Sequence, residues 1–278
     1  MSSKSKTLPA PAVGWQLTFS SASWRRRGKG LLIPLVAIAL LEVVVRIGWI
    51  PSYQMPAPSD IWLTLQDLAA GSLWSHIGVS LLRVLVGFAI GAGLALVIAA
   101  WVGLSREAES YLEPTFAALR SIPSLAWVPL LLLWLGIDET SKIVLIAIGA
   151  FFPVYVNTVA AIRNIDRKLV EVGQMYHFGP AQLARRILLP AALPGLFTGL
   201  RSGMSLAWMF LVAAELIAAT KGLGYLLTDG RETSRPDVVL ASIIVLALLG
   251  KLSDGLLAAL EKHFLAWRDA YAGNGAEA

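Results

Sequence analysis

The chain has 278 residues, of which 56% are hydrophobic and only 15% are charged. Soluble domains usually carry about 25% charged residues, so this composition, with a mean hydropathy of +0.68, excludes an ordinary soluble protein. Cysteine is absent, which excludes disulfides and thiolate chemistry.

Six apolar stretches are each close to the ~20 residues that a helix needs to cross a membrane. They are 31–49, 78–102, 114–135, 143–162, 194–219 and 237–258. An even number of spans places both termini on one side. With that side inside, fifteen Lys and Arg residues fall on the cytoplasmic side and four in external segments, the asymmetry typical of inner-membrane proteins. We therefore expect an all-α polytopic membrane protein with about six transmembrane helices and both termini in the cytoplasm.

The N-terminal segment is basic before the first apolar stretch, at Arg25–Arg27. A signal peptide would have a shorter polar leader, so we interpret this stretch as a retained first helix that ends near Gly48. No internal repeat is evident. We expect a cytoplasmic or interfacial tail (1–30), a single transmembrane domain (31–260) and a cytoplasmic C-terminal tail (261–278).

Between the fourth and fifth spans lies a polar loop, residues 163–190, with five Lys and Arg residues. Asp166 is a plausible N-cap for a first short helix. Gly179-Pro180 then breaks the chain and starts a second one, because Pro suits the first helical position and not an interior one. The pattern predicts a cytoplasmic helix pair that a soluble partner could dock on.

This loop resembles the "EAA" loop of permease subunits in binding-protein-dependent ABC importers. The residues that match the family pattern are Glu171, Gly173, Ile187, Leu189 and Pro190. The family has Gly where this chain has His177. A turn that needs a positive φ explains this departure, since His tolerates that conformation better than most residues. Gly179 would then cap the second helix.

Three further regions resemble the sulfonate/nitrate/taurine branch of these permeases, and the chain is most similar there to the aliphatic sulfonate permease subunit. They are 135–142, 152–167 and 214–226. The resemblance extends over about residues 31–268. It implies that the chain forms the translocation path for a small anion, most of all an alkanesulfonate. Taurine, nitrate and pyrimidine precursors are the alternative substrates.

The resemblance also implies the partners. Two copies of the chain would form a homodimer in the bacterial inner membrane, with two cytoplasmic ATPase subunits and an external substrate-binding protein. ATP and Mg²⁺ would bind to the ATPase, so this chain would be non-catalytic and without a cofactor or metal. The residues expected to couple it to the ATPase are Glu171, Gly173, His177, Gly179, Ile187, Leu189 and Pro190. Gly173 and Glu171 could instead stabilise the fold of the loop itself.

The fifth span carries small residues at every fourth position, Gly195, Gly199 and Gly203. Such a stripe lets two helices approach closely in lipid. The contact could lie within one subunit, or the stripe could line the translocation path or the dimer seam.

Charges within spans are costly in lipid, so each needs a reason. Glu42 and Arg46 are four residues apart and are predicted to pair. Arg201 and Glu215 lie about 21 Å apart along one helix and cannot pair directly. Arg201 is a candidate for attracting an anion in the path, and equally for reaching carbonyls of neighbouring helices or the inner interface.

Other functions find little support in the residues. The chain has no Gly-x-x-x-x-Gly-Lys-Ser/Thr phosphate loop and no His-Glu-x-x-His motif. Its three histidines lie in separate segments, and we expect His76 and His263 at the membrane interface. An autonomous secondary carrier is the alternative class, and the docking loop argues against it. The charge distribution about the spans explains the net charge of +5 without nucleic acid.

Overall fold

The computed structural model describes residues 21–267, and this part of the chain consists of helices and the turns between them. The elements are α1 (Ser21–Arg46), α2 (Pro58–Ala70), α3 (Leu73–Leu104), α4 (Arg106–Ser121), the 3₁₀-helix η1 (Ser124–Trp127), α5 (Val128–Leu135), α6 (Glu139–Arg163), α7 (Arg167–Met175), α8 (Pro180–Leu183), the π-helix η2 (Ala184–Leu188), α9 (Leu189–Ala218), α10 (Leu223–Glu232) and α11 (Pro236–Phe264).

The tails expected at 1–30 and 261–278 lie partly outside the described residues. Where they are described, both are helical, because α1 begins at Ser21 and α11 continues to Phe264. Glu42 and Arg46 of α1 form the predicted ion pair at 3.1 Å.

Four helical segments of the described chain are long and apolar enough to cross a membrane: α3, α6, the segment Ala184–Ile217 and α11. A fifth is obtained if α4 and the η1–α5 segment form one bent span. The chain is therefore an all-α polytopic membrane protein, with four or five candidate spans by length and composition. The first predicted stretch, in α1, is not among them.

The predicted third stretch, 114–135, is not one straight helix. The chain bends by 86° between α4 and the η1–α5 segment. Ile122 has an extended backbone, with φ −79° and ψ 123°, and Pro123 follows it. Pro disfavours helical backbone in the preceding residue and has no N–H to donate, so the helix ends before it.

The core of the molecule is the packing of α3, α6 and α9. Their buried side chains include Val84 on α3, Ile146 on α6 and Leu211 on α9. Close approach is possible because small residues face the neighbouring helix. A Cβ on Gly91, for example, would overlap the backbone of Ala147.

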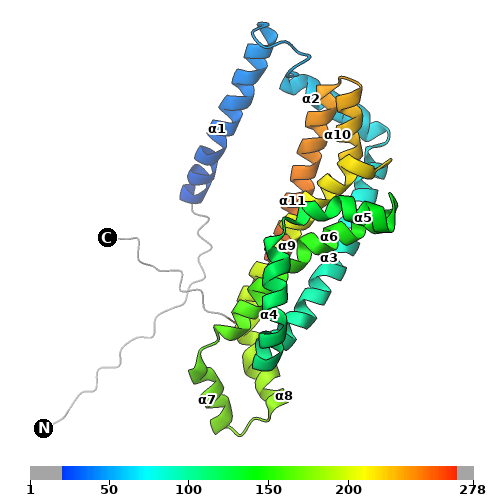
Figure 1. Ribbon diagram of the computed structural model, residues 1–278. Helices are drawn as coiled ribbons and strands as arrows, with labels where there is room; N and C mark the ends of the chain where they lie inside the picture. The colour runs from blue at the N-terminus through cyan, green and yellow to red at the C-terminus, as the bar shows by residue number, and fades with distance from the viewer. Residues whose placement is uncertain (1–20, 268–278) are drawn as a thin grey trace, which may run out of the picture.

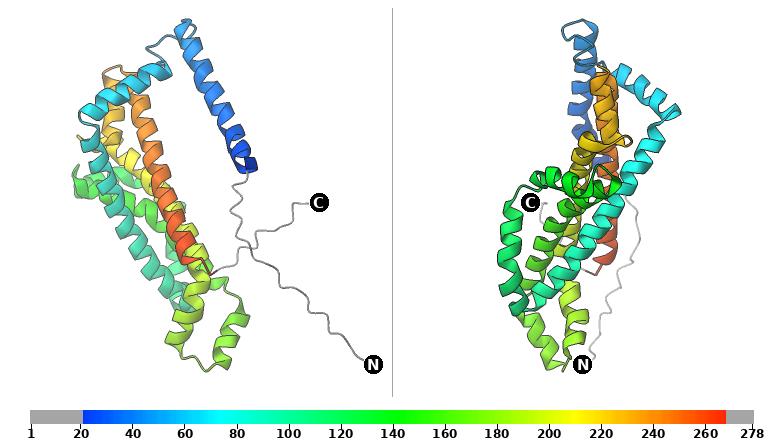
Figure 2. Two further views of the ribbon diagram at one scale, coloured as in Figure 1. Left: turned by 180° about the vertical axis from the view of Figure 1, so that it is seen from behind. Right: turned by 45° about the vertical axis from the view of Figure 1, so that its right-hand side comes forward.

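Two groups of short helices lie at opposite ends of this three-helix core (Figure 1). The α7–α8 pair projects from one end, and α2 and α10 lie at the other. Figure 2, left, shows α11 running along the core, while α1 stands apart from it beyond the α2 connection. Most described apolar side chains of α1 are consequently exposed.

Candidate functional site

The loop at 163–190 folds as the helix pair that its sequence predicts. Asp166 caps α7, since its side chain accepts a hydrogen bond from the N–H of Lys168 at 2.9 Å. His177 has a φ of +55°, so the expected positive φ at this position is confirmed. The chain then restarts as α8 at Pro180, directly after Gly179.

Gly173 lies between the two helices of this pair and is buried. A Cβ at this position would approach the Cδ1 atoms of Leu183 and Ile187 to 2.5 and 2.6 Å. A Cβ would therefore force the ends of these two flexible side chains to shift, whereas glycine allows the close contact without that adjustment. The structure places Gly173 against its own chain, which is the second of the two roles considered for it, rather than on an outer surface.

The outer surface of α7 is instead formed by large apolar side chains and by Glu171. Leu169, Val172, Met175 and Tyr176 are all exposed, Met175 by 79%. Glu171 is exposed as well and pairs with Arg167 at 3.1 Å. An ion pair of this kind on a helix surface contributes only about 0.3–0.5 kcal/mol, so Glu171 can readily exchange partners.

The second helix of the pair continues directly into the core. From Pro180 the chain passes through η2 into α9 without a break, so Ile187, Leu189 and Pro190 lie at the base of one long helical segment. At ~1.5 Å per residue, a 30-residue helix such as α9 is about 45 Å long. The segment therefore connects the helix pair to residues near the middle of the molecule (Figure 1).

The glycine stripe of α9 faces α6 of the same subunit. A Cβ on Gly195 would lie 2.5 Å from the Cβ of Ala161, and one on Gly199 would lie 2.9 Å from the Cβ of Asn157. Gly203 likewise faces Val154 at 2.7 Å. The geometry matches the alternative in which the stripe packs two helices within one subunit.

Arg201 projects from α9 toward α11, away from the glycine stripe. Its Nε and Nη2 atoms donate to Asp254 at 2.8 and 3.1 Å, and Nη1 donates to Glu261 at 3.3 Å. The two carboxylates neutralise the guanidinium of Arg201. In this conformation Arg201 therefore links α9 to α11. Its partners on the neighbouring helix are carboxylates and not the backbone carbonyls considered as an alternative.

A second group of charges lies where α3, α6 and α9 meet, and the buried Arg83 of α3 is at its centre. Its Nε and Nη2 atoms each donate to one carboxylate oxygen of Glu139 at 2.6 Å. Its Nη1 donates to Glu215 at 2.7 Å and to the carbonyl of Lys221 at 2.6 Å. The Arg83 side chain is only 5% exposed. We call Arg83, Glu139, Lys142 and Glu215 the charge cluster.

Glu215 is the fully buried member of the charge cluster, at 0% exposure. Besides Arg83, its carboxylate accepts hydrogen bonds from the hydroxyl of Ser80 at 2.7 Å and from the N–H of Gly224 at 2.7 Å. Gly222, with a φ of +128°, brings the following turn against it, and a Cβ there would overlap the carboxylate. These partners fix Glu215 in one position.

His76 lies beside this turn. It is buried, its Nδ1 accepts the N–H of Gly222 at 3.0 Å, and its ring stacks on Tyr225 with 5.9 Å between centroids. His76 therefore positions the segment that encloses Glu215. Sequence reasoning missed this because a lone histidine near the end of a span carries no signal of its partner.

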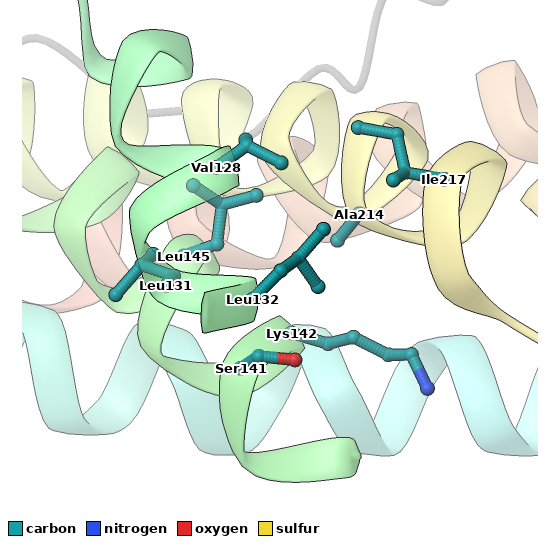
Figure 3. A pocket seen from close by; sticks show the side chains of 8 residues that line it. All are labelled: Val128, Leu131, Leu132, Ser141, Lys142, Leu145, Ala214 and Ile217. Atoms are coloured by element: carbon teal, nitrogen blue, oxygen red, sulfur yellow. The ribbon is translucent and has the colours of Figure 1, made fainter. Parts of the chain in front are cut away.

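Lys142 supplies the second cation of the charge cluster. Its side chain is 6% exposed, and its Nζ donates to Glu139 at 3.0 Å. Figure 3 shows it extending below Leu132 and Ala214, along the edge of a small apolar cavity of about 10 Å³. A cavity of this size holds at most about one water molecule, so it is not a substrate site.

The sequence did contain one signal for the charge cluster. Arg83 and Glu215 are opposite charges within apolar spans, and neither has a partner on its own helix. Charges buried in a membrane protein are usually paired, which favours a contact between them. The participation of Glu139 and Lys142, at the beginning of another helix, could not be inferred in this way.

Comparison with known proteins agrees with this architecture. Residues 87–265 match the family described as binding-protein-dependent transport system inner membrane component. A protein of Bacillus subtilis (strain 168) named as an aliphatic sulfonates transport permease, SsuC, is 44% identical over 246 residues, which cover 88% of this chain and 89% of that protein. The protein of the same name from Escherichia coli (strain K12) is 41% identical over 249 residues, covering 89% and 95% of the two chains.

The fold is also found in a solved structure. A chain of the MetNI methionine ABC transporter, in an inward-facing conformation, superposes with a TM-score of 0.54 and 20% identity. The match covers 72% of this chain and 98% of that chain, and at this identity it concerns the fold alone. The family match and the two sequence relatives identify the chain as a member of the binding-protein-dependent inner membrane component family: it is a multi-pass, non-catalytic permease subunit of an ABC importer and carries no cofactor of its own.

Proposed function

We propose that this permease carries alkanesulfonates across the inner membrane. The observation that supports this most is the similarity to permeases named for aliphatic sulfonates, which extends over nearly nine tenths of the chain. A match of this length spans the positions of the charge cluster as well as the helix pair. A substrate of this kind combines a permanent negative charge with an apolar tail.

We infer further that two copies of the chain assemble with two ATPase subunits, which bind ATP and Mg²⁺, and with an external binding protein. In this arrangement α1 and the bent α4–α5 segment cross the membrane together with the four long spans. That gives six crossings, with both termini in the cytoplasm. The transmembrane domain, 31–260, acts as one unit. Its α7–α8 pair then lies on the cytoplasmic side, where the ATPase is.

The docking surface would be the exposed face of α7, formed by Leu169, Val172, Met175 and Tyr176. Exposed apolar patches bordered by charges are typical of protein interfaces. Glu171, at the edge of this patch, can exchange Arg167 for a basic group of the ATPase. Movement of the ATPase would then pass through Gly179, Ile187, Leu189 and Pro190 into α9, while Gly173 and His177 maintain the shape of the pair.

Growth of a strain that lacks its own sulfonate permease tests the substrate. The strain receives ethanesulfonate, taurine or sulfate as the single sulfur source, or nitrate as the single nitrogen source. We expect this chain to restore growth on ethanesulfonate. Restoration on taurine without ethanesulfonate would assign an amino-substituted sulfonate as the substrate. Restoration on nitrate alone would reject the sulfonate assignment and retain the importer.

The same strain tests the docking role of Glu171. We expect Glu171→Lys to abolish growth on ethanesulfonate while the protein is inserted at its normal level, because the charge at the edge of the docking surface is reversed. Glu107→Lys, a charge reversal at another exposed glutamate, on α4, is the matched control and should restore growth. Normal uptake by Glu171→Lys would reject the docking role.

A further inference from the structure

The two carboxylates that contact Arg83 differ in how firmly they are held. Glu215 is fully buried and has fixed hydrogen-bond donors from Ser80 and Gly224. The side chain of Glu139, in contrast, is 57% exposed, and the hydrogen bonds to its carboxylate come from Arg83 and Lys142 alone. Both of these cations are almost completely buried. Glu139 is therefore the solvent-facing anion of the cluster, bound to two buried cations.

A cavity of about 370 Å³ opens directly beside this contact. Arg83, Glu139, Thr220 and Lys221 line its polar part, and Lys142 does not line the cavity but bonds to the Glu139 carboxylate at 3.0 Å. The apolar part is lined by Val79, Leu82, Val86 and Ile143. The walls thus place the guanidinium of Arg83 at one side of an apolar surface. This arrangement matches an alkanesulfonate, which has an anionic head group and an apolar chain. Ligand sites commonly combine apolar walls with a few placed polar groups in this way.

We propose that Arg83 and Lys142 form an anion-binding site on the translocation path, which the carboxylate of Glu139 occupies in this conformation and which the substrate sulfonate occupies when Glu139 moves away. This inference rests on the proposed function, because it deepens the assignment of an anionic amphiphile as the substrate. The Glu139 carboxylate stands in for the sulfonate head group, and the apolar walls receive the alkyl chain.

Charge balance explains why the exchange is favourable. With Glu139 and Glu215 both bound, the four charges of the cluster cancel. When Glu139 leaves, one positive charge remains in a poorly hydrated place, and an anion restores neutrality. The guanidinium fork, which now donates twice to Glu139, can donate in the same way to two sulfonate oxygens. Glu215 remains bonded to Arg83 while the anions exchange at this conformation of α9.

The location of the cluster connects the site to the ATPase. Glu215 lies near the end of α9, and the other end of that helix continues into the α7–α8 pair. A shift of α9 along its axis would change the position of Glu215 relative to Arg83. It would thereby alter how Arg83 faces Glu139 and the cavity. The site is placed where a movement of the helix pair can change its affinity for an anion.

The test measures binding of 1-hexanesulfonate to the purified permease–ATPase complex, without the binding protein, by isothermal titration calorimetry at constant ionic strength. We expect Glu139→Gln to bind hexanesulfonate at least about tenfold more tightly than the unaltered protein, because the competing carboxylate is lost. Adding Arg83→Gln or, separately, Lys142→Gln to Glu139→Gln should remove this gain. Ethanesulfonate should bind more weakly than hexanesulfonate, since it fills less of the apolar wall.

Glu113→Gln, which alters a carboxylate bonded to Tyr155 outside the cluster, is the matched control and should leave binding unchanged. Should Arg83→Gln fail to fold, the Lys142→Gln variant still decides the question. Equal binding by the unaltered protein and Glu139→Gln, or undiminished binding after Lys142→Gln is added, would overturn the proposal. Growth on ethanesulfonate tests the proposed function independently. If this chain restores growth but Glu139→Gln binds hexanesulfonate no more tightly than the unaltered protein, the anion site is rejected and the proposed function is retained.

Discussion

At the scale of single residues, the charge cluster contains two carboxylates of the same type with opposite surroundings. Glu215 has no contact with solvent and accepts hydrogen bonds from a hydroxyl, a guanidinium and a backbone N–H. Glu139 is more than half exposed and contacts two cations. Equal substitutions at the two positions should therefore have unequal effects.

We predict that Glu215→Gln destabilises the protein much more than Glu139→Gln does. Removing one partner of a buried ion pair typically costs about 3–5 kcal/mol, because the remaining charge is left without compensation. At Glu139 the loss is smaller, because its own side chain is 57% exposed and Arg83 retains Glu215 as a partner. Thermal unfolding of the purified variants in detergent measures the difference. Similar melting temperatures for the two variants would show that both carboxylates are equally fixed, contrary to the geometry.

The conformation of His177 gives a second prediction at this scale. Its φ of +55° is accessible to glycine without strain but is unfavourable for β-branched residues. His177→Gly should retain ATPase binding and uptake, whereas His177→Val should weaken both by distorting the α7–α8 pair, at a cost of about 1–2 kcal/mol. Co-purification with the ATPase measures the effect. Full binding by His177→Val would mean that the turn can adopt another conformation.

At the scale of helices, the contact between α6 and α9 depends on the glycine stripe. We predict that Gly199→Leu separates the two helices, because a Cβ alone would already lie 2.9 Å from the Cβ of Asn157 and 3.3 Å from the Cα of Val154. Overpacking a well-packed contact costs about 1–3 kcal/mol and can exceed this where backbone must move.

Gly250→Leu is the matched control for this experiment. Gly250 also lies within a long helix, α11, but nothing is within 4 Å of a Cβ built there. Size-exclusion chromatography with fluorescence detection after heating should show early loss of Gly199→Leu and near-normal behaviour of Gly250→Leu. If Gly199→Leu were as stable as the control, α9 would have to move relative to α6 at little cost.

At the scale of the whole molecule, the absence of cysteine allows the proposed topology to be tested by single substitutions. Tyr53 follows α1 and Met175 ends α7, and their side chains are 72% and 79% exposed. With six crossings and cytoplasmic termini, they lie on opposite sides of the membrane. Tyr53→Cys should react with an impermeant maleimide in spheroplasts, and Met175→Cys should react only after the membrane is permeabilised. The reverse labelling pattern would show that the topology is opposite to the one proposed.

The sequence alone determined the features that depend on neighbouring residues and on solvent. Apolar length predicted an all-α membrane protein, because backbone polar groups in lipid must be satisfied within helices. The cap at Asp166, the restart at Pro180 and the positive φ at His177 were predictable as well, since each follows from the local chemistry of one or two residues. The break at Pro123 was equally local, although the continuous apolar stretch concealed it.

Only the tertiary structure decided which distant groups meet. Arg83 and Glu215 are 132 positions apart, and Glu139 joins them from a third helix. Arg201, which the sequence suggested for an anion, is neutralised by Asp254 of α11. Gly173 is enclosed by its own helix pair. Each outcome depends on how helices cross and rotate in lipid, and helical periodicity identifies a face without identifying the helix that it contacts.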